Sequence, residues 1–182
     1  MDFTLILGPM KSGKTLELIS RFSPLTYANL KAGLFQPFLN VRDKEMESRS
    51  GAKIMAQKIK RLDEILKEYW EVVCIDEIHM FNSEEIEVVG DLLKQGVKVM
   101  ISGLDMDYRG RLFPTVARLL EFGPQEIIYK RAVCEACRKP NAVYTQIFKD
   151  GRAITSGVPS VIPEDGTYLY RPVCRQCFVK TV

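Results

Sequence analysis

The sequence predicts an α/β fold, in which a parallel sheet flanked by helices is followed by a small C-terminal lobe. Two features carry this prediction. Short apolar runs alternate with helical patterns over residues 1–130, and such alternation favours a parallel sheet that is covered on both faces. Beyond that point the chain changes to β-type runs enclosed by two pairs of cysteines. We therefore expect one domain at residues 1–130 and a second at residues 131–182.

The composition is that of an ordinary globular protein, with 46% apolar and 27% charged residues. A net charge of +3 is too small to indicate nucleic-acid binding by itself. No apolar run approaches the ~20 residues of a membrane span, and no secretory signal is visible, so we expect a cytoplasmic protein without a membrane partner. In the cytoplasm, the five cysteines are expected to be thiols or metal ligands rather than disulfides.

The first strand-to-helix connection carries a phosphate-binding motif. Residues 8–15 match G-x-x-x-x-G-K-[ST] and lie between an apolar run at 3–7 and a helical pattern from Lys14 toward Lys31. The glycines permit the turn, and backbone N–H groups and the helix N-terminus can then bind phosphate. A chance glycine-rich turn is disfavoured, because strand and helix are both in place. This motif predicts a P-loop NTPase-type sheet. The expected ATP- and phosphate-binding residues are Gly8, Pro9, Met10, Lys11, Ser12, Gly13, Lys14 and Thr15.

An acidic pair follows a later apolar strand. Residues 71–75 predict that strand, and Asp76 and Glu77 close it. Lys14 is expected to reach the β- and γ-phosphates, while the Thr15 hydroxyl and the Asp76 carboxylate would hold Mg²⁺. In isolation, an Asp-Glu pair is more simply a solvated strand end. The upstream phosphate loop is what favours a phosphoryl-transfer site.

The remaining elements follow from apolar periodicity and from glycine and proline positions. Pro24 should end the first helix near Phe22. Residues 40–51 are polar and highly charged and are expected to form a mobile loop, whereas residues 102–113 should form a loop at the carboxyl end of a strand, where ligands bind in such sheets. Further strands are expected at 34–38, 52–59, 97–101 and 126–129, and further helices at 62–69, 82–94 and 114–122.

Four of the five cysteines form two C-x-x-C pairs that flank β-type runs at 143–148 and 158–162. Two such pairs favour a tetrahedral Cys₄ zinc site that closes a ribbon-like lobe. Two unrelated pairs of thiols are disfavoured, because the spacing of both pairs is identical. The fifth cysteine, Cys74, lies within a predicted strand and is expected to be a buried apolar residue. The expected zinc ligands are Cys134, Cys137, Cys174 and Cys177.

Together these motifs resemble the thymidine kinase family, of the zinc-containing type found in bacteria and eukaryotes. The resemblance covers nearly the whole chain. It is most specific at residues 103–113 and at the two cysteine pairs, which have Tyr144-Thr145 between them. It extends to the Pro-Met within residues 8–15, to residues 75–77 and to residues 170–177. It implies ATP-dependent phosphorylation of the thymidine 5′-hydroxyl to give dTMP and ADP, a step of pyrimidine deoxynucleoside salvage.

The resemblance also implies roles for individual residues. Glu77 would be the general base, with Lys14 and Arg42 as further catalytic residues. A loop called the lasso covers the base in this family and would lie here at about 161–170, and zinc would be structural, since four cysteines leave no open position. For Arg42 and Arg109, a solvated loop position is an equally simple alternative. For the apolar residues the alternative is core packing, which their place within matched motifs disfavours. The implied thymidine-binding residues are Met10, Leu104, Arg109, Phe113, Thr145, Val161 and Tyr170.

Three positions depart from the family pattern. His79 and Met80 stand where the family usually has Gln and Phe, and Asp165-Gly166 stands where the lasso usually carries Gly-Gly. The acceptance of deoxyuridine or analogues therefore stays open, as does the order of residues 40–51 and 156–170 without ligand. The resemblance further implies a homotetramer and feedback inhibition by the end-product triphosphate. It implies thymidine and ATP as the ligands of the protein, and no stable nucleic-acid partner.

Two other functions are compatible with parts of the sequence. The first is a P-loop ATPase whose zinc ribbon binds nucleic acid, and the second is a catalytically silent nucleotide-binding regulator. The modest net charge and the lack of a basic stripe with interleaved aromatic residues count against the first. The presence of Lys14, Thr15, Asp76 and Glu77 counts against the second.

Overall fold

A computed structural model describes residues 2–40, 45–47, 53–162 and 166–180. Within this part of the chain, a six-stranded sheet has the order β5-β2-β6-β7-β1-β8, and all of its neighbouring strands run parallel. This confirms the predicted parallel sheet. Its strands are β1 (Phe3–Leu7), β2 (Ala32–Pro37), β5 (Gln57–Ile59), β6 (Val72–Ile75), β7 (Lys98–Gly103) and β8 (Glu126–Tyr129).

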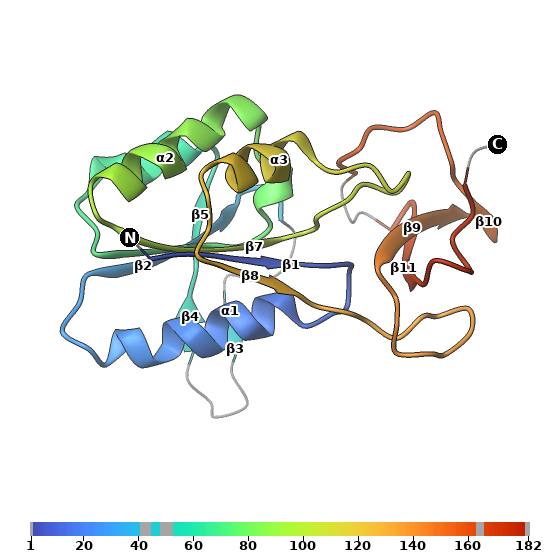
Figure 1. The fold of residues 1–182 in the computed structure, drawn as a ribbon, viewed down its shortest axis with the longest axis horizontal. Helices are drawn as coiled ribbons and strands as arrows, with labels where there is room; N and C mark the ends of the chain where they lie inside the picture. The colour runs from blue at the N-terminus through green and yellow to red at the C-terminus, as the bar shows by residue number, and fades with distance from the viewer. Residues whose placement is uncertain (1, 41–44, 48–52, 163–165, 181–182) are drawn as a thin grey trace.

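Helices cover both faces of the sheet (Figure 1). Helix α1 (Lys14–Phe22) lies on one face, and α2 (Glu87–Lys94) and α3 (Pro114–Glu121) lie on the other. As predicted, α1 ends before Pro24, and a 3₁₀-helix at Ser23–Thr26 follows. Among the described residues, no helix is both long enough and apolar enough to cross a membrane.

The alternation of side chains along each strand divides the core into two layers. Leu5 and Leu7 of β1 belong to the cluster beneath α2 and α3, whereas Ile6 belongs to the cluster beneath α1. Cys74 lies in the second cluster and is fully buried, as predicted. Burial raises the pKa of its thiol, so this cysteine stays protonated and apolar. Apolar packing on both faces of the sheet fixes the positions of the carboxyl ends of the strands.

Two predicted elements are replaced by pairs of shorter ones. The strand expected at 52–59 is divided into β4 (Lys53–Met55) and β5, and β4 pairs antiparallel with β3 (Glu45–Glu47), within the segment expected to be a loop. The rest of that predicted loop, including Arg42, lies outside the described residues. The helix expected at 82–94 begins as a 3₁₀-helix at Ser83–Ile86 and continues as α2.

Two further predictions need correction. The helix expected at 62–69 is a 3₁₀-helix at Leu62–Lys67, because apolar spacing at i and i+3 suits both helix types. The β-type run at 158–162 forms no strand in the described structure. Proline at position 159 lacks the N–H that a ladder needs, and the carbonyl of Val158 instead accepts a hydrogen bond from the Tyr108 hydroxyl.

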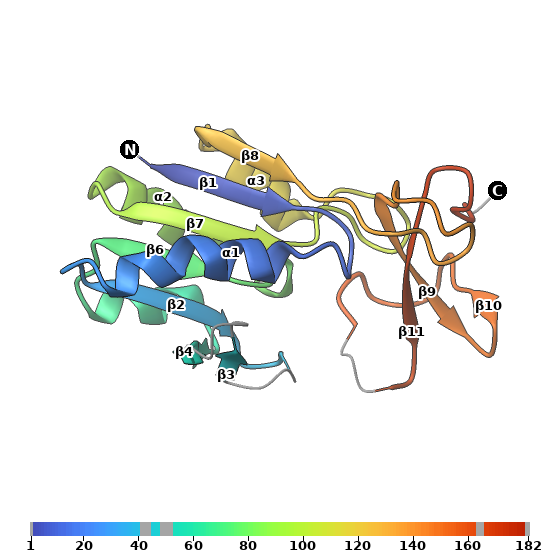
Figure 2. The same ribbon diagram turned by 90° about the horizontal axis from the view of Figure 1, so that it is seen from below.

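A small second lobe lies beyond the carboxyl ends of the main sheet (Figure 2). Its antiparallel sheet has the order β10-β9-β11 within the described residues, with β9 at Tyr144–Lys149, β10 at Arg152–Ala153 and β11 at Leu169–Val173. Strand β11 was not predicted. The lobe has its own apolar cluster around the cysteines, in which the rings of Tyr144 and Phe178 stack with centroids 4.3 Å apart.

Candidate active site

The loop between β1 and α1 requires glycine at two positions. Gly8 has φ 143°, and a Cβ atom there would lie 2.4 Å from the carbonyl oxygen of Lys130. Gly13 caps α1 in the left-handed conformation, with φ 81°. Both conformations are unfavourable for other residues. The backbone of this loop therefore passes close to Lys130, the residue that follows β8, before helix α1 begins.

Polar side chains of this loop turn inward. Lys14 is buried, and its Nζ atom donates a hydrogen bond of 2.8 Å to the carbonyl oxygen of Pro9. The hydroxyl of Ser12 is also buried, and it has no hydrogen-bond partner within the part of the chain that the structure describes. A buried hydroxyl without a partner is uncommon in folded proteins. The loop thus has the donors that a phosphate group requires.

Asp76 connects the ends of three elements. Its Oδ2 atom accepts a hydrogen bond of 2.8 Å from the Thr15 hydroxyl in α1, and its Oδ1 atom accepts one from the Ser102 hydroxyl in β7. The Asp76 side chain is buried, with 1% exposure. Burial raises the pKa of Asp76, and the neighbouring Glu77 raises it further, against the donors Ser102 and Thr15. A cation at this position would favour the charged carboxylate.

Glu77 takes the left-handed conformation, with φ 53°, which is uncommon for a non-glycine residue. It precedes a short 3₁₀-helix at Ile78–Met80. The Nδ1 atom of His79 lies 3.6 Å from Oε2 of Glu77 and accepts a hydrogen bond of 3.3 Å from the backbone N–H of Leu104. The His79 ring also packs against Phe113, with centroids 5.1 Å apart. His79 is therefore a buried residue beside the candidate base.

A pocket lies next to Glu77, and its water-accessible volume is about 50 Å³. Four of the residues implied to bind thymidine line it, namely Met10, Leu104, Val161 and Tyr170. The pocket therefore joins the phosphate loop, the sheet and the second lobe. Among the described residues, its lining consists of Met10, Leu39, Asn40, Glu77, His79, Met80, Leu104, Ser160, Val161, Ile162 and Tyr170.

The other implied thymidine-binding residues lie around this pocket rather than in its described lining. Phe113 is buried beneath His79. The Thr145 hydroxyl accepts a hydrogen bond of 2.9 Å from the backbone N–H of Met10, and so connects the phosphate loop with β9. The Arg109 guanidinium is paired with Asp107 at 2.8 Å.

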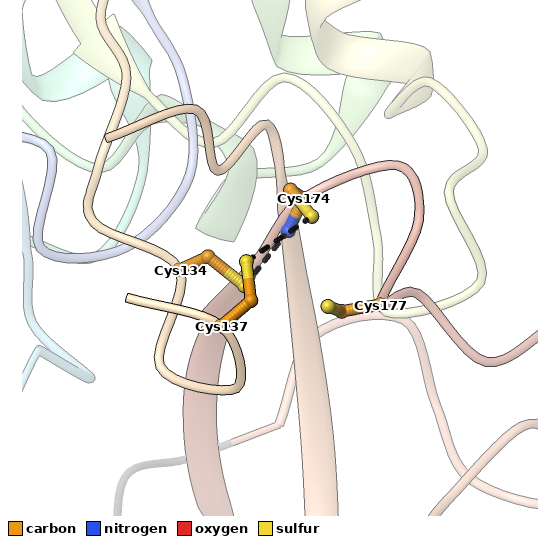
Figure 3. Close-up of side chains that lie close together, drawn as sticks. All are labelled: Cys134, Cys137, Cys174 and Cys177. Atoms are coloured by element: carbon orange, nitrogen blue, oxygen red, sulfur yellow. Dashed lines mark hydrogen bonds between the residues drawn. The ribbon is translucent and has the colours of Figure 1, made fainter. Parts of the chain in front are cut away.

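The four predicted cysteine ligands gather at one point of the second lobe (Figure 3). Their Sγ atoms all lie within 4.8 Å of one another, and those of Cys137 and Cys174 are 3.8 Å apart. A tetrahedron with Zn–S distances of about 2.3 Å has S–S edges of about 3.8 Å. The cysteines are free thiols and their arrangement fits a tetrahedral metal ion.

Backbone N–H groups in the two knuckles stabilise a thiolate. Burial alone would raise the pKa of Cys134, but the N–H groups of Cys137, Cys174 and Ala136 outweigh it and lower the pKa to about 6. The thiolate is the form that binds metal. The first knuckle also contacts the phosphate loop, because Lys11 donates a hydrogen bond of 2.7 Å to Glu135.

Three polar residues of this region were not predicted from the sequence. Ser102, which bonds Asp76, could have been found from its place at the carboxyl end of an apolar strand. Asp105 and Asp107 are both buried and stand in the stretch that resembles the family. Burial raises the pKa of Asp105, while its own backbone N–H and the charge of Lys14 lower it. The sequence did not indicate that Asp105 and Asp107 are buried, because both are polar residues in a short loop.

The fold is that of an α/β protein with a pocket and buried polar side chains at the carboxyl ends of its parallel strands. A family model described as Thymidine kinase matches residues 1–178. The chain is also 36% identical over 181 residues to a thymidine kinase of Thermococcus kodakarensis, and the match covers 94% of this chain and 90% of that protein. The chain belongs to the thymidine kinase family.

Family membership confirms the resemblance found in the sequence and the predicted enzyme class, a thymidine kinase. It implies the use of ATP. The alternative of a nucleic-acid-binding ATPase is not favoured.

Proposed function

We propose that the chain transfers the γ-phosphoryl group of ATP to the 5′-hydroxyl of thymidine, giving dTMP and ADP, at the edge of the sheet where β1, β6 and β7 end. One observation carries the assignment to this site. Asp76 is hydrogen-bonded to Thr15 of the phosphate loop, whereas the adjacent Glu77 lines the pocket. In this proposal Asp76 would face the phosphate donor, ATP, and Glu77 would face the acceptor, thymidine.

Residues 8–15 are proposed as a P-loop that holds the ATP phosphates. The inward-facing Lys14 and the unpartnered Ser12 hydroxyl, considered within the described residues, support this role. Thr15 and Asp76 supply the oxygen ligands that Mg²⁺ prefers, and they are the residues that would hold it. When bound, Mg²⁺ would neutralise charge on the phosphates.

Glu77 is proposed as the general base. Its position in the pocket wall suits a carboxylate that orients the 5′-hydroxyl and accepts its proton. Met10, Leu104, Val161 and Tyr170 would contact the nucleoside. The present pocket of about 50 Å³ is well below the roughly 300 Å³ of ordinary ligand sites, so nucleoside binding requires this pocket to widen.

The remaining implied residues support this site from outside the pocket. Thr145 would fix the phosphate loop through its bond to Met10, and Phe113 would support His79 beside Glu77. The catalytic role of Arg42 rests on the resemblance, because this residue lies outside the described part of the chain.

The four cysteines are proposed to hold a structural Zn²⁺, which the arrangement of their Sγ atoms supports. In this proposal residues 131–182 form a separate zinc-ribbon lobe whose lasso, at about 161–170, contributes to the nucleoside pocket of domain 1–130. Zn²⁺ would fix the two ends of that lobe relative to each other. A homotetramer and a cytoplasmic location stay predictions.

Release of ADP is the measurement that tests the proposed function. The purified protein is incubated with ATP and Mg²⁺, and thymidine, other nucleosides or single-stranded DNA are added separately. We expect ADP release that depends on thymidine, with dTMP formed in equal amount. Release stimulated by DNA without a nucleoside would instead identify the ATPase alternative, and bound ATP without turnover would identify a silent regulator.

A further inference from the structure

The segment at residues 158–162, here called the pocket segment, belongs to the second lobe but contacts the main domain. Ser160, Val161 and Ile162 line the pocket beside Glu77. Val161 also packs against the apolar core of the sheet domain. Because the pocket segment forms no strand in the described structure, side-chain contacts rather than a backbone ladder must fix its position.

Asp107 lies at the centre of those contacts. It stands in the loop after β7 and its exposure is only 4%. Its Oδ1 atom accepts hydrogen bonds from the backbone N–H groups of Arg109 at 2.9 Å and Arg111 at 3.0 Å. Its Oδ2 atom accepts one of 2.8 Å from Nε of Arg109 and a longer one, 3.3 Å, from the Ser160 hydroxyl.

Two neighbouring side chains complete the connection to the pocket segment. Nη2 of Arg109 donates a hydrogen bond of 2.6 Å to the Ser160 hydroxyl oxygen. The Tyr108 hydroxyl, on a buried side chain, donates one of 2.8 Å to the carbonyl oxygen of Val158. The loop after β7 therefore holds the pocket segment on both sides of Pro159.

The same geometry gives Arg109 a role other than direct substrate binding. Its guanidinium is already bonded to a buried carboxylate and to Ser160. A charge-assisted pair of this kind is strong and directional, and it fixes the side chain that reaches the pocket segment. Loss of Arg109 would leave the buried charge of Asp107 without this partner, which is costly.

We propose that Asp107 is a positioning residue for the nucleoside site, which acts through Arg109 and Ser160 to hold Val161 against the pocket. The proposal rests on the proposed function of that pocket. Asp107 need not touch thymidine or ATP. Its loss should weaken nucleoside binding selectively, because the phosphate loop and the Asp76–Glu77 pair are held by other contacts.

The test is Asp107→Asn, which keeps the side-chain size and the Oδ1 acceptor but removes the charge that holds Arg109. We expect the KM for thymidine to rise by roughly tenfold, or about 1.4 kcal/mol of binding free energy. The KM for ATP should change by less than about twofold, and kcat should also change by less than about twofold. Ser160→Ala and Tyr108→Phe, which each remove one hydroxyl, should shift the same constant in the same direction by a smaller factor.

Hydrogen exchange provides a readout that does not depend on activity. Amides of the peptide spanning 156–162 should exchange faster in Asp107→Asn than in the unaltered protein. Arg118→Gln is the matched control, because it breaks an exposed arginine–carboxylate pair with Glu87 away from the pocket, and it should change neither readout. If Asp107→Asn does not fold, Ser160→Ala and Tyr108→Phe still test both expectations.

The outcomes separate this proposal from the proposed function. Unchanged exchange at 156–162 would overturn the proposed contact. Faster exchange with an unchanged thymidine KM would show that the contact does not position the nucleoside site, which also overturns the proposal. If the unaltered protein shows no thymidine-dependent ADP release, the proposed function fails, and the exchange data still decide whether Asp107 holds the pocket segment.

Discussion

The Thr15 hydroxyl donates a hydrogen bond of 2.8 Å to Oδ2 of Asp76, 61 positions further along the chain. The bond joins the first turn of α1, the helix that follows β1, to the carboxyl end of β6, which β7 separates from β1 in the sheet. It closes the phosphate loop onto the acidic pair. In the proposed enzyme, these two oxygens would share the Mg²⁺ ion that accompanies ATP.

Thr15→Val tests this arrangement with little change of shape. The variant lacks the hydroxyl that bonds Asp76, so we expect roughly a 10- to 100-fold higher Mg²⁺ concentration for half-maximal activity, the usual effect of losing such a group at a metal site. Thr26→Val is the control, since the exposed Thr26 hydroxyl donates a local hydrogen bond to the Ser23 carbonyl oxygen. An unchanged Mg²⁺ dependence in Thr15→Val would remove Thr15 from the metal site.

Asp76→Asn should stabilise the ligand-free protein although it removes activity. Burial and Glu77 raise the pKa of Asp76 above the ordinary aspartate value of 3.8. The folded state then binds more protons than the unfolded state, so its stability falls as the pH rises from about 3.8 through the raised pKa. At pH 7 the variant avoids this cost, and its Tm should be higher by about 2–4 °C for each kcal/mol recovered.

The Tm of Asp76→Asn and of the unaltered protein is measured without nucleotide or divalent cations. The pH runs from 4 to 8, roughly the range over which protonation of Asp76 changes the stability. The advantage of Asp76→Asn should shrink as the pH falls toward the lower limit. A variant that is less stable than the unaltered protein at pH 7 would show that Asp76 stabilises the fold rather than serving a ligand.

Gly8→Ala should damage both the fold and nucleotide binding. The new Cβ would lie 2.4 Å from the Lys130 carbonyl oxygen, at a φ of 143°. We expect a loss of roughly 2 kcal/mol or more in the free energy of unfolding, together with weaker ATP binding. Gly96→Ala is the control, because Gly96 also has a positive φ, but no atom of another described residue beyond its two chain neighbours lies within 4 Å of its Cβ position. Equal losses in the two variants would show that the approach to β8 is not tight.

Cys174→Ser should lower the zinc content from about one ion per chain, the stoichiometry of a Cys₄ site. The lobe that carries Val161 and Tyr170 would lose order, so the KM for thymidine should rise more than that for ATP. Cys74→Ala should keep its zinc, since Cys74 is buried in the sheet core away from the cluster. Full zinc occupancy in Cys174→Ser would show that the Cys₄ assignment is wrong.

Local sequence patterns predicted the parts of the candidate site that stand at the ends of strands. Residues 8–15 and Asp76 were identified because apolar strands lead into them, and parallel strands place their carboxyl ends at one edge. The same rule applied to Ser102, but a single serine carries no chemical motif. The 3₁₀-helix at Leu62–Lys67 was expected as an ordinary helix, since a span this short has the same apolar spacing in either form.

Contacts between the two lobes could not be predicted. The bonds from Asp107 and Tyr108 to residues 158–160 join positions about fifty residues apart, and periodicity describes only neighbours in sequence. The β-type composition at 158–162 favoured a strand, but Pro159 and the bonds to another loop give this segment an irregular path. Arg109 was expected at the substrate from the family resemblance, and nothing in the sequence indicated that it pairs with the buried Asp107.

The central claim is that Glu77 accepts the proton of the thymidine 5′-hydroxyl while the neighbouring Asp76 serves the phosphates. The most direct measurement is single-turnover dTMP formation by Glu77→Gln, with the Kd for ATP measured in parallel. We predict a rate that is roughly 10²- to 10⁴-fold lower, the usual contribution of a general base, with the Kd for ATP nearly unchanged. A rate close to that of the unaltered protein would contradict the account.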